Sequence, residues 1–189
     1  MKKVAKLTLF LLLVTGICGA ALGYVNSITA PVIAMQDEEK LLRGYEEVYP
    51  GADEYRPLGY DGPEGVIAGV VAAIKDGQVA GVLYMVEPKG YGGEIAMLVG
   101  FDAAMGKITG LKILSQGETP GLGGNCVQPW FAGRFAGKSA GRELRLVKVE
   151  TSAEDEVQGI TASTITSAAV LAGVNAARAD FAANYGGVG

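Results

Sequence analysis

An uncharged segment near the N-terminus limits the architectures open to this chain. Three lysines lie within the first six residues, and no charged residue occurs from Leu7 to Gln36. Within that run, Leu7–Val25 is almost entirely apolar and would extend about 28 Å as a helix, close to the ~30 Å hydrocarbon core of a bilayer. Lysines before the run and acidic residues after it predict a cytoplasmic N-terminus. We therefore expect a single-pass protein of the cytoplasmic (inner) membrane, with the N-terminus and anchor over 1–30 and an extracytoplasmic domain over 31–189.

A cleaved signal peptide is the alternative to a retained anchor, because it has the same arrangement of charges. The small residues Gly19–Ala21 would tolerate cleavage. The apolar region of a signal peptide is usually ~7–15 residues long, however, and the run here is longer, which favours the retained anchor. Pro31 is expected to end or kink any helix that continues beyond the anchor.

Composition excludes several classes of site and partner. The chain contains no histidine and only two cysteines, which removes histidine-based catalytic triads and four-cysteine metal centres. Its net charge of −4 argues against a broad basic surface, so we expect no nucleic-acid partner. The chemistry left to the chain is that of hydroxyls, carboxylates, backbone amides or a bound cofactor.

The remaining sequence predicts an α+β domain in which antiparallel hairpin strands are flanked by helices. Lys75–Gln78 is a good hairpin turn between two apolar runs, and a second hairpin surrounds Gly106. Trp130, Phe131 and Phe135 after Pro129 suggest a short helix that Gly137 ends, with aromatic side chains in the core. The expected helices are 37–49, the short segment after Pro129, and 167–185; the expected strands are 66–74, 79–86, 94–102, 107–114 and 144–149.

Two segments have compositions that suit neither ordinary strands nor ordinary helices. Gln116–Gly124 holds four glycines and a proline, which favours a rigid turn with exposed amides, although a plain surface loop fits the spacing as well. Gly159–Ser167 is rich in hydroxyl side chains and leads into the last expected helix, which Thr166 or Ser167 would cap. The N–H groups of that first turn would stabilise a phosphate near Thr164, whereas simple helix capping is the plainer explanation of the hydroxyls.

Taken together, these segments resemble a known family. The pairing of Glu118–Gly123 (Glu-Thr-Pro-Gly-Leu-Gly) with Ile160–Ser167 resembles the RnfG-type FMN-binding subunits of the Rnf electron-transport complex, and the related NqrC subunits of the sodium-pumping NADH:quinone oxidoreductase. The resemblance extends over nearly the whole chain, including Asn26-x-x-Thr29-x-Pro31, Gly90–Gly93 and Ile108–Leu111.

The resemblance implies a covalently bound FMN. In that family a Ser/Thr-Gly-Ala-Thr motif carries FMN, joined through its phosphate to the final threonine. Thr161 takes the first position here, Ala162 and Ser163 replace the Gly-Ala pair, and Thr164 takes the flavin-bearing position. Ser163 is then an alternative acceptor for the flavin phosphate. The added methyl of Ala162 also penalises a positive φ, should the turn need one.

The rest of the expected cofactor site comes from the glycine-rich loop and its neighbours, with no catalytic residue and no metal ligand among them. Glu118 is expected to order the loop through hydrogen bonds, or else to be a solvated carboxylate. The full set of expected cofactor-binding residues is Thr164, Thr161, Ser163, Thr166, Glu118, Thr119, Gly121, Leu122, Gly123, Tyr91 and Gly92.

The implied function is electron transfer without substrate turnover by the isolated chain. The resemblance implies membrane subunits of an Rnf-type ferredoxin:NAD oxidoreductase as partners, coupled to sodium or proton translocation, and a separate flavin transferase for maturation. Two alternatives stay open. One is an assembly domain of the same fold without flavin, and the other is the corresponding subunit of a sodium-pumping quinone reductase.

Overall fold

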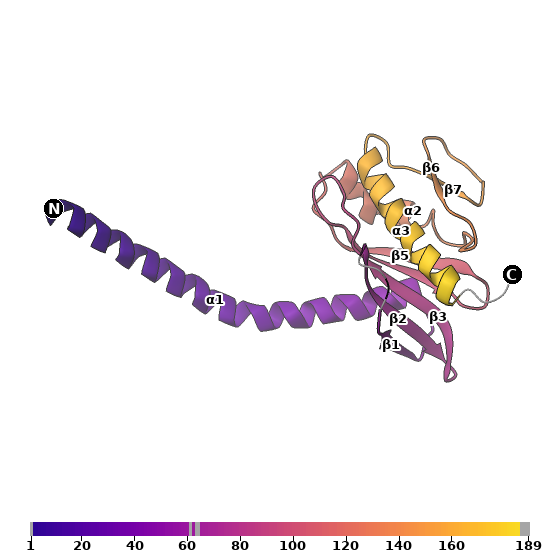
Figure 1. Ribbon diagram of the computed structural model, residues 1–189, viewed down its shortest axis with the longest axis horizontal. Coiled ribbons are helices and arrows are strands. Elements are labelled where there is room, and N and C mark those ends of the chain that lie inside the picture. The colour runs from indigo at the N-terminus through magenta and orange to yellow at the C-terminus, as the bar shows by residue number, and fades with distance from the viewer. Residues whose placement is uncertain (1, 61, 63–64, 186–189) are drawn as a thin grey trace. The chain divides into compact units, whose positions relative to one another are not determined.

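The computed structural model describes residues 2–60, 62 and 65–185, and the chain divides into two compact units, Met1–Leu41 and Leu42–Gly189. Helix α1 (Lys2–Val48) enters both units and continues through Pro31, so the separate helix expected over 37–49 is part of one element (Figure 1). An interior proline removes one backbone donor and crowds the carbonyl four residues before it. Helix α1 nevertheless runs on from Pro31 to Val48, so of the two expected effects of the proline, an end to the helix does not occur.

The first part of α1 is long and apolar enough to cross a membrane. Its best window has a mean hydropathy of 2.0, and none of that window is buried against the protein. The exposed side chains there include Leu9, Phe10 and Leu13. Side chains of this kind are stable on a helix surface when lipid surrounds it.

The second unit is built on a five-stranded antiparallel sheet in which each strand pairs with the next. Its strands are β1 (Glu54–Leu58), β2 (Ile67–Lys75), β3 (Gln78–Val86), β4 (Ala96–Asp102) and β5 (Lys107–Ser115), in the order β1-β2-β3-β4-β5. Asp76 and Gly77 join β2 to β3 with φ of 52° and 76°, the two left-handed residues that a tight hairpin turn requires. The α+β class and both expected hairpins are confirmed, whereas β1 was not expected.

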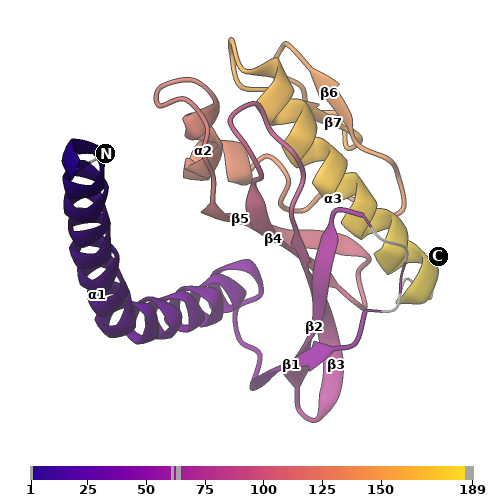
Figure 2. The same ribbon diagram turned by 60° about the vertical axis from the view of Figure 1, so that its left-hand side comes forward.

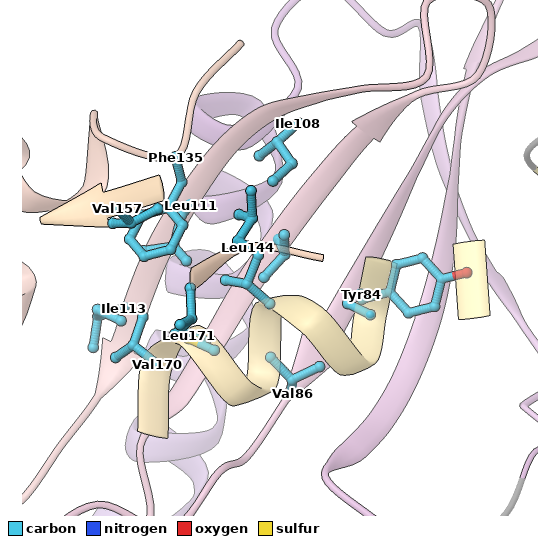
Figure 3. Close-up of a cluster of buried hydrophobic side chains, with 14 of the residues drawn as sticks. Tyr84, Val86, Ile108, Leu111, Ile113, Phe135, Leu144, Val157, Val170 and Leu171 are labelled. Atoms are coloured by element: carbon cyan, nitrogen blue, oxygen red, sulfur yellow. The ribbon is translucent and has the colours of Figure 1, made fainter. Parts of the chain in front are cut away.

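Helices cover both faces of this sheet, which explains why β3 and β4 are buried along most of their length. Helix α3 (Thr164–Asn184) runs along one face (Figures 1 and 2), where Phe181 stacks on Phe101 with ring centroids 4.8 Å apart. Tyr84, in the cluster of Figure 3, donates a 2.8 Å hydrogen bond to Asp180 of α3. On the other face, Val48 at the end of α1 packs against Gly100 and Gly110.

Short elements connect the sheet to α3, and most differences between the expected and the observed structure lie in them. A 3₁₀ turn, η1 (Gly123–Val127), leads into α2 (Pro129–Ala132), which is shorter than the helix expected to reach Gly137. Phe131 and Phe135 are buried as expected, but Trp130 is exposed, with the Arg134 guanidinium 4.7 Å from its ring centre. The strand expected over 144–149 is β6 (Arg145–Val147), and it pairs in parallel with an unexpected strand, β7 (Glu156–Gln158).

Candidate functional site

A cleft lies where the glycine-rich loop meets the start of α3. Its volume is about 460 Å³, within the range of small-molecule and cofactor sites. Three segments that are far apart in the sequence form its walls: the loop before β4, the loop after β5, and the first turn of α3. The lining residues are Tyr91, Glu118, Thr119, Leu122, Gly123, Ala162, Ser163, Thr164, Ile165 and Thr166.

The carboxylate of Glu118 joins these three segments. Its side chain is only 6% exposed, and Oε1 accepts a 2.8 Å hydrogen bond from the backbone N–H of Gly92. Oε2 accepts a hydrogen bond from the hydroxyl of Thr166 in the first turn of α3. The interpretation of Glu118 as a residue that orders the loop fits this geometry, and the solvated carboxylate does not. The negative charge of Glu118 also affects a neighbouring thiol. Burial and the nearby Glu118 carboxylate together raise the pKa of Cys126 to about 11.

Two glycines are required by the close approach of these loops. A Cβ on Gly92 would lie 2.1 Å from the carbonyl oxygen of Gly117. A Cβ on Gly123 would lie 2.4 Å from both Glu118 Oε2 and Thr166 Oγ1. Any side chain at either position would therefore displace the Glu118 contacts. Gly121 serves a different purpose, because its φ of +78° is the left-handed conformation of a turn.

The turn that leads into α3 also contains a left-handed residue. Ala162 has a φ of +60°, which alanine rarely adopts because its Cβ crowds the following carbonyl oxygen. The position is the one where the resembling family has glycine, and here an alanine adopts a conformation that glycine takes without strain. Ser167 stabilises the turn, since its hydroxyl accepts from the N–H of Ile160 and donates to the carbonyl of Ser163.

The cap of α3 differs from the expected one. The helix begins at Thr164 with Ser163 as its N-cap, three residues before the predicted start at Ser167. Thr166 and Ser167 lie inside the helix, and their hydroxyls bond to Glu118 and to the carbonyl of Ser163. Ser163 makes no side-chain capping bond within the described structure. Neither hydroxyl caps the helix, because that of Thr166 bonds to the distant Glu118 and that of Ser167 bonds within the turn that leads into α3.

Thr164 presents an exposed side chain at this end of the cleft. It is the first residue of α3 and lines the cleft. The N–H groups of the first turn of a helix have no partners within the helix, and the helix dipole is positive there. A phosphate on the Thr164 oxygen would therefore lie beside backbone donors and a favourable potential, without a lysine or arginine.

Comparison with known proteins connects this geometry to a family. The FMN-binding domain family matches residues 90–179, which include all three walls of the cleft. Over 188 residues the chain is 36% identical to the G subunit of the Na(+)-translocating ferredoxin:NAD(+) oxidoreductase complex of Acetobacterium woodii. That alignment covers 92% of this chain and 89% of the relative. The chain belongs to this RnfG family.

A second relative agrees with the assignment to the RnfG family, and a solved structure shares the fold. The G subunit of the proton-translocating ferredoxin:NAD(+) oxidoreductase complex of Clostridium ljungdahlii is 33% identical over 161 residues, covering 85% of this chain and 82% of the relative. The fold is similar to the crystal structure of the C subunit of the Na(+)-translocating NADH-quinone reductase of Parabacteroides distasonis. That structure has a TM-score of 0.54 and 25% identity, over 69% of this chain and 76% of the other. The fold is thus shared by the two kinds of protein that the sequence resembles.

Most of the residues expected from the RnfG resemblance lie together around the cleft. Three do not line it: Thr161 is exposed in the preceding turn, Gly121 forms the loop turn, and Gly92 donates its N–H to Glu118. Two lining residues were missed, Ala162 and Ile165. Ala162 occupies a motif position and could have been included for that reason. Ile165 carried no signal, because an isoleucine between hydroxyl residues gives no indication of which way it points.

Proposed function

We propose that this protein carries electrons through FMN held by a phosphoester bond to Thr164. The observation that carries the proposal is the exposed Thr164 side chain, which lines a cleft of about 460 Å³ at the N-terminus of a 21-residue helix. The cofactor is of the class named by the matching domain family. FMN would supply the one- and two-electron redox chemistry, for which the side chains of the cleft have no equivalent.

The residues around Thr164 would hold and orient the cofactor. The first-turn N–H groups of α3 would stabilise the phosphate charge. The side chains of Tyr91, Leu122 and Ile165 line the cleft and are 73%, 44% and 56% exposed, so the flat aromatic ring of the flavin against them would remove their apolar surface from water. Glu118 would keep the walls at a fixed separation through its bonds to Gly92 and Thr166.

Attachment is proposed to require a separate flavin transferase acting on FAD. The Thr164 oxygen would form a bond to the flavin-side phosphorus, the pyrophosphate bond would break, AMP would leave, and the hydroxyl proton would pass to a base of the transferase. The exposure of Thr164 supports attachment by a transferase, since that second protein must reach the threonine oxygen. The burial of Ser163, which is 7% exposed, makes it the poorer acceptor of the two.

The proposed setting is an ion-translocating ferredoxin:NAD oxidoreductase complex in the cytoplasmic membrane. The apolar part of α1 supports anchoring, and the N-terminal lysines support an extracytoplasmic FMN domain. The partners would be other membrane subunits of the complex, and the isolated chain would turn over no substrate. The two RnfG relatives belong to complexes that translocate sodium and protons respectively, so family membership leaves both ions open for this chain.

A flavin-free assembly domain of the same fold is the second candidate. The observation that favours it is the replacement of the Gly-Ala pair by Ala162 and Ser163, with Ala162 held at a φ of +60°. A transferase that requires glycine there would leave the chain unmodified.

Intact-mass analysis of protein purified from its own organism tests the proposal. We expect a mass increase equal to FMN less one water, and a fluorescent band under ultraviolet light on a denaturing gel. Thr164→Val should remove both signals. Ser152→Ala is the control, because Ser152 is exposed and lies outside both the cleft lining and the motif from Thr161 to Thr164, and it should keep both signals. A bare polypeptide in the wild type would favour the assembly domain, and a Thr164→Val protein that still carries flavin would place the bond elsewhere.

A further inference from the structure

The hydroxyl of Ser163 is buried without a partner. The residue is 7% exposed, and in the part of the chain that the structure describes its Oγ has no hydrogen-bond partner. Buried polar groups in folded proteins are nearly always paired, because an unpaired one costs about 1–3 kcal/mol. An unpaired hydroxyl in the wall of a cleft therefore points to a ligand atom that completes it.

The position of Ser163 restricts what that ligand atom can be. Ser163 is the N-cap of α3 and lines the cleft next to Thr164. Its carbonyl accepts hydrogen bonds from the N–H and the hydroxyl of Ser167, so its backbone is already engaged while its side chain is free. Donors of the first helical turn surround the same point, and the helix dipole is positive there. A group rich in acceptor oxygens and negatively charged would satisfy the hydroxyl and these donors together.

We propose that Ser163 Oγ donates a hydrogen bond to a phosphoryl oxygen of the flavin, so that the cleft recognises a flavin phosphate before any covalent bond forms. The inference rests on the proposed function for the identity of the ligand. It assigns to Ser163 a positioning role in place of the acceptor role that the sequence left open. Ser163 would hold the phosphoryl group beside Thr164, and the family pattern quoted above, which has alanine at this position, lacks such a hydroxyl.

The contact can be measured on full-length chain that has never been flavinylated. Protein produced in a host without a flavin transferase, and purified in detergent, would be titrated with free FMN and with riboflavin, which has the same ring and no phosphate. Flavin fluorescence gives the dissociation constants. We expect the wild type to bind FMN more tightly than riboflavin, and Ser163→Ala to weaken FMN binding about tenfold while leaving riboflavin binding unchanged. Ser152→Ala, an exposed serine outside the cleft lining, is the matched control and should change neither constant.

Thermal unfolding gives a second readout that needs no flavin. Removing an unpaired buried hydroxyl should leave the melting temperature of Ser163→Ala equal to or above that of the wild type. Inorganic phosphate should raise the melting temperature of the wild type more than that of Ser163→Ala, because only the wild type has the hydroxyl donor.

Three results would overturn the proposal. They are equal FMN affinities in the wild type and Ser163→Ala, an equal loss of FMN and riboflavin binding in the variant, and no measurable FMN binding by the wild type. None of these depends on the covalent bond, which the intact mass of native protein tests separately. Failure of this proposal and failure of the proposed function can therefore be told apart.

Discussion

A single alanine holds the backbone in a left-handed conformation just ahead of the last helix. Ala162 has a φ of +60°, a conformation that costs about 1–2 kcal/mol for a residue with a Cβ and almost nothing for glycine. The conformation persists because Ser167 and Glu118 fix the segments on either side of it. The turn thus needs the backbone that glycine adopts most easily, and this chain forms it with a strained residue.

We expect Ala162→Gly to raise the free energy of unfolding by about 0.5–1 kcal/mol. Relief of the left-handed strain should exceed the extra entropy that glycine gives to the unfolded chain. Urea denaturation in detergent measures the change. Ala172→Gly, an exposed position within α3, is the control of opposite sign and should lower the same free energy by about 0.5–1 kcal/mol. Destabilisation by both substitutions would show that the turn does not strain Ala162.

At the scale of single residues, the sequence predicted which residues would lie near one another but not what each hydroxyl does. Thr164, Thr166 and Glu118 do lie around one cleft. The capping role expected of Thr166 or Ser167 was wrong, because every serine and threonine in the run is an acceptable cap. Only the folded positions of Glu118 and of the turn show which hydroxyls are already engaged, and therefore that the hydroxyl of Ser163 is free.

At the scale of elements, the two loops around the cleft are in backbone contact. We expect Gly92→Ala to lower the free energy of unfolding by about 1–3 kcal/mol, because its Cβ would lie 2.1 Å from the carbonyl oxygen of Gly117. Gly69→Ala in β2 is the matched control, since nothing lies within 4 Å of its Cβ position, and it should change stability by less than about 0.5 kcal/mol. Equal effects in urea denaturation would mean that the loops move apart freely.

The elements that the sequence predicted well are those with strong local signals. The hairpin of β2 and β3 combines apolar runs with an Asp-Gly turn, and its ends were placed within one residue. Strand β1 was missed because it lies at the sheet edge, contains Pro57 and has no regular alternation of apolar residues. Strand β7 is three residues long and forms only by pairing with β6, so its local sequence carries no signal.

At the scale of the whole molecule, the last turns of α1 belong structurally to the second unit. Tyr45 and Val48 are 6% and 1% exposed, whereas the side chains of the apolar run are exposed. The chain divides between Leu41 and Leu42, and the expected membrane boundary at 30/31 stays a prediction.

We expect a chain that begins at Asp37 to fold in water without detergent. A chain that begins at Tyr49 should be less stable by about 3 kcal/mol or more, because it lacks the buried side chains of Tyr45 and Val48. Urea denaturation of the two truncated proteins, which differ only in the last turns of α1, measures the difference. Equal stability would show that the end of α1 contributes nothing to the sheet unit.

The hydrogen bonds of Glu118 make the cleft beside Thr164 dependent on the tertiary fold. They join residues 26 and 48 positions apart in the chain, so the cavity beside Thr164 exists only once the sheet and α3 have come together. A polypeptide threading through a membrane in extended form has no such cavity. The proposed transferase, if it recognises the shape of this cavity, can act only on folded protein, and an unfolded variant would then stay unmodified even with Thr164 intact.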